Sequence, residues 1–276
     1  MRIALGVSYN GQAYNGWQSQ PSGNTVQDHL EAALGRFTAQ EVSTICAGRT
    51  DAGVHGLMQV VHFDTDLQRT NSSWVRGTNT FLPKDIAVHW ACEVPEGATG
   101  FHSRASAIGR RYAYVLLQSP VRPSVESGRV GWVFQPLDAQ RMRDAAQILL
   151  GEHDFSSFRA SGCQAKSPVK TLRQIDIHFR EATSAPGRDG QMPCGYWRFE
   201  FEGSAFLHHM IRNIMGCLIY IGQGSKPVEW MQYVLDARSR EVAAPTFSPD
   251  GLYFLGPVYE ARWGLPDSTA PFAWLP

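Results

Sequence analysis

The sequence lacks a hydrophobic run long enough to cross a membrane. A membrane-spanning helix needs about 18 to 20 apolar residues in a row, whereas the most apolar segment, residues 210–222, contains Arg212 and Asn213. The first residues, Met1–Val7, alternate as a strand does and lack the continuous apolar core of a secretion signal. We therefore expect a protein that neither spans a membrane nor is exported.

Paired cysteines and cofactor motifs are also missing. The five cysteines are odd in number, widely spaced and form no C-x-x-C motif, which is typical of reduced thiols in a cytoplasmic protein. The chain has no G-x-S-x-G motif and no complete phosphate- or dinucleotide-binding glycine motif. His208 and His209 are adjacent, and neighbours on a helix point about 100° apart, so we expect no shared metal ion. The sequence thus predicts neither a metal nor a cofactor.

Lysine is scarce, and the net charge is zero. The 25 basic residues balance 25 acidic ones, but only four of the basic residues are lysine and the other 21 are arginine. Arginine suits bidentate contacts with phosphate and stacking on bases. Residues 98–125 and 155–175 contain arginine or lysine and no acidic residue. On charge alone, solvated surfaces explain these segments as well as a nucleic-acid partner does.

Hydrophobic periodicity predicts the same order of elements in both halves of the chain. In the first half we expect strands and helices in the order β-α-β-β-α-β, at residues 3–9, from Thr25 onward, 41–46, 57–64, 72–80 and 86–93. Thr25 followed by Asp28 is a variant of the capping box that starts a helix. In the second half we expect strands at 108–117, 170–179, 196–202 and 252–260, and helices at 138–150, 204–221 and 227–238.

This order predicts an α+β protein with two ferredoxin-like halves and a mostly antiparallel sheet. We place the domains at residues 1–106 and 107–276, with a cleft where the two sheets meet. An insertion at 182–195 and a proline-containing tail from Leu265 are expected to be irregular.

The loop Ala-Gly-Arg-Thr-Asp-Ala-Gly-Val-His-Gly, residues 47–56, is the strongest candidate for chemistry. Its three glycines let the backbone turn tightly and approach a ligand, and the flanking strands would hold Asp51 as a rigid scaffold holds a catalytic group. Arg49 would share a face with Asp51 if the loop is extended. The alternative is that Asp51 only caps its own turn.

Three further segments favour a functional role for Asp51 over a purely structural one. The strand at residues 110–114 interleaves arginine and tyrosine, as surfaces that stack bases and hold phosphates do, although such strands are also common elsewhere. Arg212 lies in a helix that is apolar nearly all round, so a carboxylate partner is expected, with Asp51 among several candidates. Residues 151–159 have the composition of a binding loop or of a packed connection.

The chain resembles the tRNA pseudouridine synthase A (TruA) family. The loop at residues 47–56 looks like the family's catalytic-aspartate signature, and comparable segments follow in order from the first strand to about residue 263. These segments are Gly16–Gln18, Thr25–Gln27, Asn79–Ile86, Phe101–Arg104, Arg110–Tyr112, Gly151–Phe158, Phe206–Asn213 and Gly251–Tyr253. Thr80 departs from the small residue that is more common there, and the insertion and tail lie outside the match.

The resemblance implies a pseudouridine synthase fold with a basic cleft between its halves. It implies a cytoplasmic homodimer that isomerises uridine to pseudouridine at positions 38, 39 and 40 of the tRNA anticodon stem-loop, without a cofactor. By the same resemblance Asp51 is the catalytic nucleophile or base, and Tyr112 stacks on the target uracil and helps remove its C5 proton. Arg212 would pair with the aspartate, and Arg49 would help displace the base. We also expect substrate contacts from Arg104, Arg110, Arg111 and His55.

Two other classes of function remain open from the residues. A catalytically silent RNA-binding protein would account for the arginine bias and the aromatic strand, but not for an aspartate framed by glycines. A hydrolase that uses Asp51 on a phosphate or glycoside is less well supported, because no metal cluster or second catalytic carboxylate is visible in the sequence.

Overall fold

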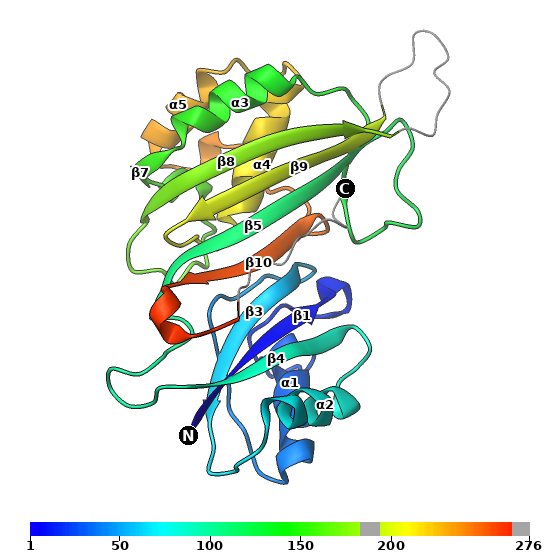
Figure 1. Ribbon diagram of the computed structural model, residues 1–276. Helices are drawn as coiled ribbons and strands as arrows, with labels where there is room; N and C mark the ends of the chain where they lie inside the picture. Colours follow the sequence, from blue (N-terminus) through cyan, green and yellow to red (C-terminus); the bar gives the residue numbers. More distant parts are fainter. Residues whose placement is uncertain (183–193, 267–276) are drawn as a thin grey trace. The chain divides into compact units, whose positions relative to one another are not determined.

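The computed structural model describes residues 1–182 and 194–266. Most of the predicted insertion and tail therefore lie outside the described residues. The fold is mixed α+β with mostly antiparallel strands (Figure 1). The strands are β1 (Arg2–Tyr9), β2 (Ile45–Cys46), β3 (His55–Asp64), β4 (Ile86–Val94), β5 (Ala107–Gln118), β6 (Gly131–Val133), β7 (Gly151–Asp154), β8 (Val169–Glu181), β9 (Gly195–Gly203) and β10 (Leu252–Tyr259). The α-helices in the described part are α1 (Val26–Thr38), α2 (Asn71–Phe81), α3 (Ala139–Ile148), α4 (Met210–Gly222) and α5 (Trp230–Ala237).

The chain forms two compact units. Unit 1 consists of Met1–Arg111 together with the described residues from Tyr253 onward, and unit 2 consists of Tyr112–Leu252. The last strand, β10, thus lies mainly with the first part of the chain, which sequence order alone does not indicate. The predicted domain boundary between residues 106 and 107 stays a prediction.

In unit 1 the strands are hydrogen-bonded in the order β4-β1-β3-β10, and β2 pairs with β3. Strand β1 runs antiparallel to β3 and to β4, whereas β10 is parallel to β3. Helices α1 and α2 cover one face of these strands (Figure 1). Ile3, Leu5 and Val7 point to that face and form a core with Leu30 of α1 and Trp74 of α2.

The other face of β1 is buried as well. Ala4 packs there with Val60 and Phe101, and Tyr259 and Trp263 lie against this second cluster. Both faces of β1 are therefore covered, because successive side chains of a strand point to opposite sides. This double burial makes β1 a firm support for the segments that follow it.

Local signals placed the first helix correctly. The Thr25 side chain accepts from the backbone N–H of Asp28, and the Asp28 carboxylate accepts from the Thr25 N–H. The predicted capping box is therefore confirmed, and α1 begins at Val26.

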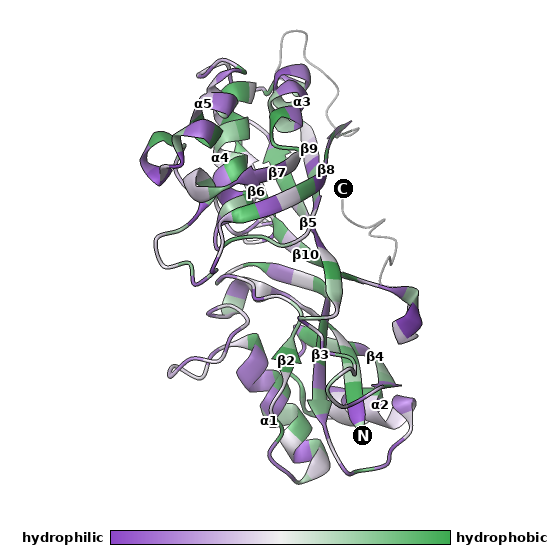
Figure 2. Ribbon diagram, turned by 90° about the vertical axis from the view of Figure 1, so that its left-hand side faces the viewer, coloured by the Kyte–Doolittle hydropathy of each residue, from purple (hydrophilic) through white to green (hydrophobic). Residues whose placement is uncertain are grey.

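In unit 2 the strand order is β5-β9-β8-β7, with β6 alongside β5. Strands β7, β8 and β9 are antiparallel neighbours. Helix α4 is almost entirely buried and is mainly green in Figure 2. The helix predicted at residues 204–221 begins only at Met210, because His209 adopts the left-handed conformation with φ of 61°. Across the described ranges, no helix combines the length and the apolar content that crossing a membrane requires.

Candidate active site

Asp51 lies in the connection between β2 and β3, on a short turn. The backbone N–H of Val54 donates to the carbonyl of Asp51 at 3.1 Å. Gly53 lies inside this turn with φ of 79°, a backbone conformation that residues other than glycine rarely adopt. The side chain of Asp51 is half-buried. A tight main-chain turn thus carries the predicted catalytic carboxylate.

The start of the loop is fixed to β3 and β5. Ala47 donates its N–H to the carbonyl of Val60 at 2.9 Å. The buried amide of Gln59 bonds both the N–H and the carbonyl of Gly48, at 3.3 and 2.5 Å. A guanidinium nitrogen of Arg110 reaches the carbonyl of Ala47 at 3.3 Å. These contacts give the residues before Asp51 little freedom.

The residue directly before Asp51 is held by the end of β1 and by the segment that follows it. The hydroxyl oxygens of Thr50 and Tyr9 lie 2.9 Å apart in a buried position. The N–H of Trp17 donates to the carbonyl of Thr50 at 3.1 Å. A Cβ on Gly16 would lie only 2.7 Å from that carbonyl oxygen, so only glycine allows this close approach.

The end of the loop is anchored through His55. Its Nδ1 accepts from the N–H of Gly11 at 3.1 Å, and its ring stacks on Tyr253 with centroids 4.6 Å apart. The residue is only 2% exposed. A Cβ on Gly11 would fall 2.0 Å from the carbonyl oxygen of Val54. We predicted that His55 contacts substrate, but its burial favours a role in holding the loop.

The predicted arginines differ in their exposure. Arg49 and Arg104 are exposed, and Arg111 is half-buried. Arg110 is also half-buried, and its guanidinium donates to the carbonyls of Arg104 and Ala107 as well as to the loop. Arg49 and Arg104 are therefore accessible to solvent, whereas the Arg110 guanidinium is hydrogen-bonded to main-chain carbonyls.

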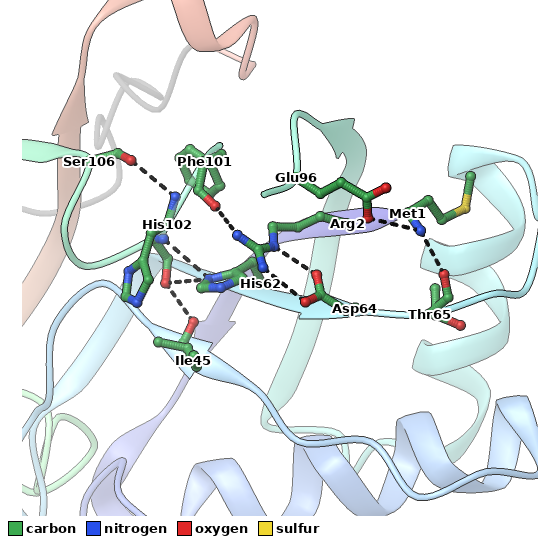
Figure 3. Close-up of polar contacts among 11 residues, drawn as sticks. Met1, Arg2, Ile45, His62, Asp64, Thr65, Glu96, Phe101, His102 and Ser106 are labelled. Carbon is green, nitrogen blue, oxygen red and sulfur yellow. Dashed lines mark hydrogen bonds and ion pairs between the residues drawn. The ribbon is translucent and has the colours of Figure 1, made fainter. Parts of the chain in front are cut away.

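Figure 3 shows how the segment that carries Arg104 is held in place. The N–H of Ser103 donates to Nδ1 of His62 at 3.2 Å. A guanidinium nitrogen of Arg2 donates to the carbonyl of Phe101 at 2.8 Å. The exposed side chain of Arg104 thus extends from a segment whose backbone is fixed on β1 and β3.

In unit 2, Tyr112 and Arg212 occupy ordered positions. Tyr112 is 8% exposed, and its ring meets Phe206 edge to face at 5.1 Å. Arg212 lies in the first turn of α4, and its Nε donates to the carbonyl of Phe247 at 2.8 Å. The residue is half-buried, whereas its neighbours Ile211 and Asn213 are buried.

The expectation that His208 and His209 point apart was wrong. Their ring centroids lie 4.0 Å apart, because both residues precede α4 and do not follow helical geometry.

The segment at residues 151–159 is a packed connection rather than an open loop. Its first residues form β7, and Phe155, Ser157 and Phe158 are fully buried. The amide of Asn213 on α4 donates to the carbonyl of Phe158 at 2.8 Å. The aromatic residues therefore serve the core of unit 2.

A family model described as tRNA pseudouridine synthase matches residues 6–102 and 145–260. The chain belongs to the tRNA pseudouridine synthase family. It is 75% identical to the tRNA pseudouridine synthase A of Acidovorax ebreus (strain TPSY), 73% identical to that of Paracidovorax citrulli (strain AAC00-1) and 72% identical to that of Delftia acidovorans (strain DSM 14801 / SPH-1). Each similarity covers 100% of both chains.

As a tRNA pseudouridine synthase, the protein is an isomerase that acts on uridine in tRNA. The family match contains Asp51 with its whole loop, and it contains Arg212. Arg104 and Tyr112 fall in the gap between the matched ranges. The roles expected for these two residues therefore depend on the resemblance of their own short motifs.

Proposed function

We propose that this tRNA pseudouridine synthase modifies positions 38, 39 and 40 of the anticodon stem-loop and uses Asp51 as its catalytic carboxylate. The observation that carries this proposal is the construction of the Asp51 turn. The residues on the two sides of the turn are bonded to Tyr9 at the end of β1 and to Gly11, while the aspartate itself is half-buried and keeps some access to solvent. Rigid support of a reactive side chain is what a catalytic group requires.

The reaction needs an ionised carboxylate. The bond between ribose C1′ and uracil N1 breaks, the base turns, and a bond forms between C1′ and C5. The C5 proton leaves and N1 gains a proton, so the product is an isomer of the substrate. A carboxylate assists by attacking C1′ or C6 or by removing the 2′ proton, and each route requires its charged form.

Tyr112 and Arg212 complete the proposed machinery. Uracil must leave the base stack, which costs a few kcal/mol, and restacking on a ring such as Tyr112 offsets part of that cost. The edge contact with Phe206 fixes the plane of the Tyr112 ring. In the proposal, the Arg212 guanidinium pairs with Asp51 and stabilises its charge.

Exposed arginines would hold the RNA backbone. Arg49 and Arg104 are exposed and come from segments whose backbones are hydrogen-bonded to β3. Arg49 would also help displace the target base, and the half-buried Arg111 of β5 would add a further contact. Fixed guanidinium groups suit phosphate because they reach two oxygens at once.

The remaining features of the proposal concern the assembly and its setting. We expect a homodimer, and we expect each chain to have two ferredoxin-like halves with a basic cleft. The strand order β4-β1-β3, with β2 on β3, supports a ferredoxin-like first half. All five cysteines are free, which supports a cytoplasmic location. We expect no cofactor, so activity should survive dialysis against a chelator.

Two measurements test this function. Purified protein should release tritium from C5-labelled uridine in tRNA, with or without EDTA, whereas an RNA-binding protein without activity releases none. Mapping of pseudouridine in tRNA from cells with and without the protein should show losses at positions 38 to 40. Unchanged modification at those positions contradicts the proposed substrate.

A further inference from the structure

We propose that the hydroxyl pair of Tyr9 and Thr50 is a positioning device that sets the direction of the Asp51 carboxylate. This inference rests on the proposed catalytic role of Asp51 and adds two residues that act through the backbone of the loop.

The first support is the location of Thr50. It directly precedes Asp51, and its side chain is buried. The Thr50 hydroxyl lies 2.9 Å from the hydroxyl of Tyr9, at the end of β1. Because Thr50 is held at its side chain, rotation of the peptide between residues 50 and 51 is restricted, and this peptide determines where the Asp51 side chain points.

The second support is that Tyr9 is itself immobile. Its ring packs against Gly56, where a Cβ would lie 2.4 Å from the ring, and its centroid is 5.5 Å from that of Trp17. Trp17 in turn donates its N–H to the carbonyl of Thr50. The buried Tyr9 side chain therefore contacts both Gly56, at the end of the loop, and the Thr50 hydroxyl. Trp17, which packs against Tyr9, bonds the Thr50 carbonyl.

The third support is the anchoring beyond Asp51. His55 accepts from Gly11, so the last residues of the loop are tied to the same chain segment as Thr50. The turn at Asp51 consequently spans two points that are fixed to residues 9–17. With both points fixed, loss of one hydroxyl bond changes the orientation of the turn rather than releasing the whole loop.

The experiment compares Thr50→Val with Thr50→Ser, and Tyr9→Phe with Tyr14→Phe. Thr50→Val keeps the shape and removes the hydroxyl, and Thr50→Ser keeps the hydroxyl. Tyr14→Phe is a matched control, because Tyr14 belongs to the same core as Tyr9. It also loses a hydroxyl hydrogen bond, but that bond is made to Asp85, at 2.6 Å, and not to the loop. For each variant we would measure the melting temperature, the tRNA dissociation constant and the single-turnover rate of pseudouridine formation.

We expect Thr50→Val and Tyr9→Phe to slow the single-turnover rate by about 10-fold to 100-fold, as small misplacements of a reacting group do. Their dissociation constants for tRNA should stay within about two-fold of wild type, because a positioning loss acts on the transition state rather than on binding. Thr50→Ser and Tyr14→Phe should keep the wild-type rate, and the Tyr9→Phe Thr50→Val double variant should be no slower than the slower single variant.

Two results would overturn the inference. One is a wild-type rate in both Thr50→Val and Tyr9→Phe. The other is a rate that decreases in proportion to the melting temperature in every variant, including Tyr14→Phe. That result would show that the substitutions act only by destabilising the fold. Asp51→Asn is assayed in parallel to separate the two proposals. If Asp51→Asn is active, the proposed function fails, whereas an inactive Asp51→Asn with unaffected Tyr9 and Thr50 variants refutes only the positioning role.

Discussion

The backbone N–H of Ser103 donates to Nδ1 of His62 at 3.2 Å, which ties the segment that carries Arg104 to β3. An imidazole nitrogen accepts a hydrogen bond only when it carries no proton. Burial of the ring, with added repulsion from Arg2 and His102, lowers the pKa of His62 to about 4. The neutral ring is therefore the form that the folded protein favours.

This pairing predicts a loss of stability in mild acid. The pKa of a histidine in an unfolded chain is about 6.5, so between about pH 6.5 and pH 4 the unfolded state binds more protons at His62 than the folded state does. The free energy of unfolding should fall as pH drops through this window. Urea unfolding at several pH values measures it, and His62→Asn, which keeps an acceptor but does not titrate, should show a weaker pH dependence. An equal dependence in both proteins would contradict the assignment.

Gly16 and Gly23 offer a matched test of the contact beneath the Asp51 loop. Both have positive φ, at 87° and 66°, but a Cβ would meet the Thr50 carbonyl at 2.7 Å only at Gly16. Gly23→Ala should lose about 1 to 2 kcal/mol of stability from its backbone conformation alone. Gly16→Ala should lose more and should also slow the reaction, because the loop must move. Thermal unfolding and single-turnover assays check both effects, and equal rates in the two variants would count against the contact.

The capping box of α1 gives a prediction about stability alone. Thr25→Ala removes the acceptor for the Asp28 N–H and should lower the free energy of unfolding by about 1 kcal/mol. Thr25→Ser keeps the hydroxyl and should behave nearly as wild type in urea unfolding. The rate per folded molecule should not change, so a slower Thr25→Ala enzyme at low temperature would show that α1 affects the site.

The sequence predicted those elements whose signals are local. Alternation placed β1, and the Thr25 cap placed α1 within a residue. The predicted start of α4 was too early, because His209 adopts a left-handed conformation directly before the helix. No glycine or other sequence signal indicates that conformation. Strand β7 was missed because its four residues are mostly polar and exposed or half-buried.

The candidate site was predictable to a similar extent. Glycine spacing and family resemblance selected the Asp51 loop, but neither indicates that Thr50 meets Tyr9, which lies 41 residues away in the chain. The close approach of Gly11 and Gly16 to the loop likewise becomes evident only in the folded chain. Burial of His55 likewise depends on β10, which arrives from the end of the chain.

The central claim is that Asp51 performs the chemistry, and its most direct test is single-turnover tritium release by Asp51→Asn at saturating enzyme. The substitution removes the charge and preserves the size of the side chain. We predict a melting temperature close to that of wild type, because the backbone hydrogen bonds of the loop do not involve the Asp51 side chain. We also predict normal tRNA binding and no detectable pseudouridine. Substantial tritium release by Asp51→Asn, with the product confirmed as pseudouridine, would contradict the account.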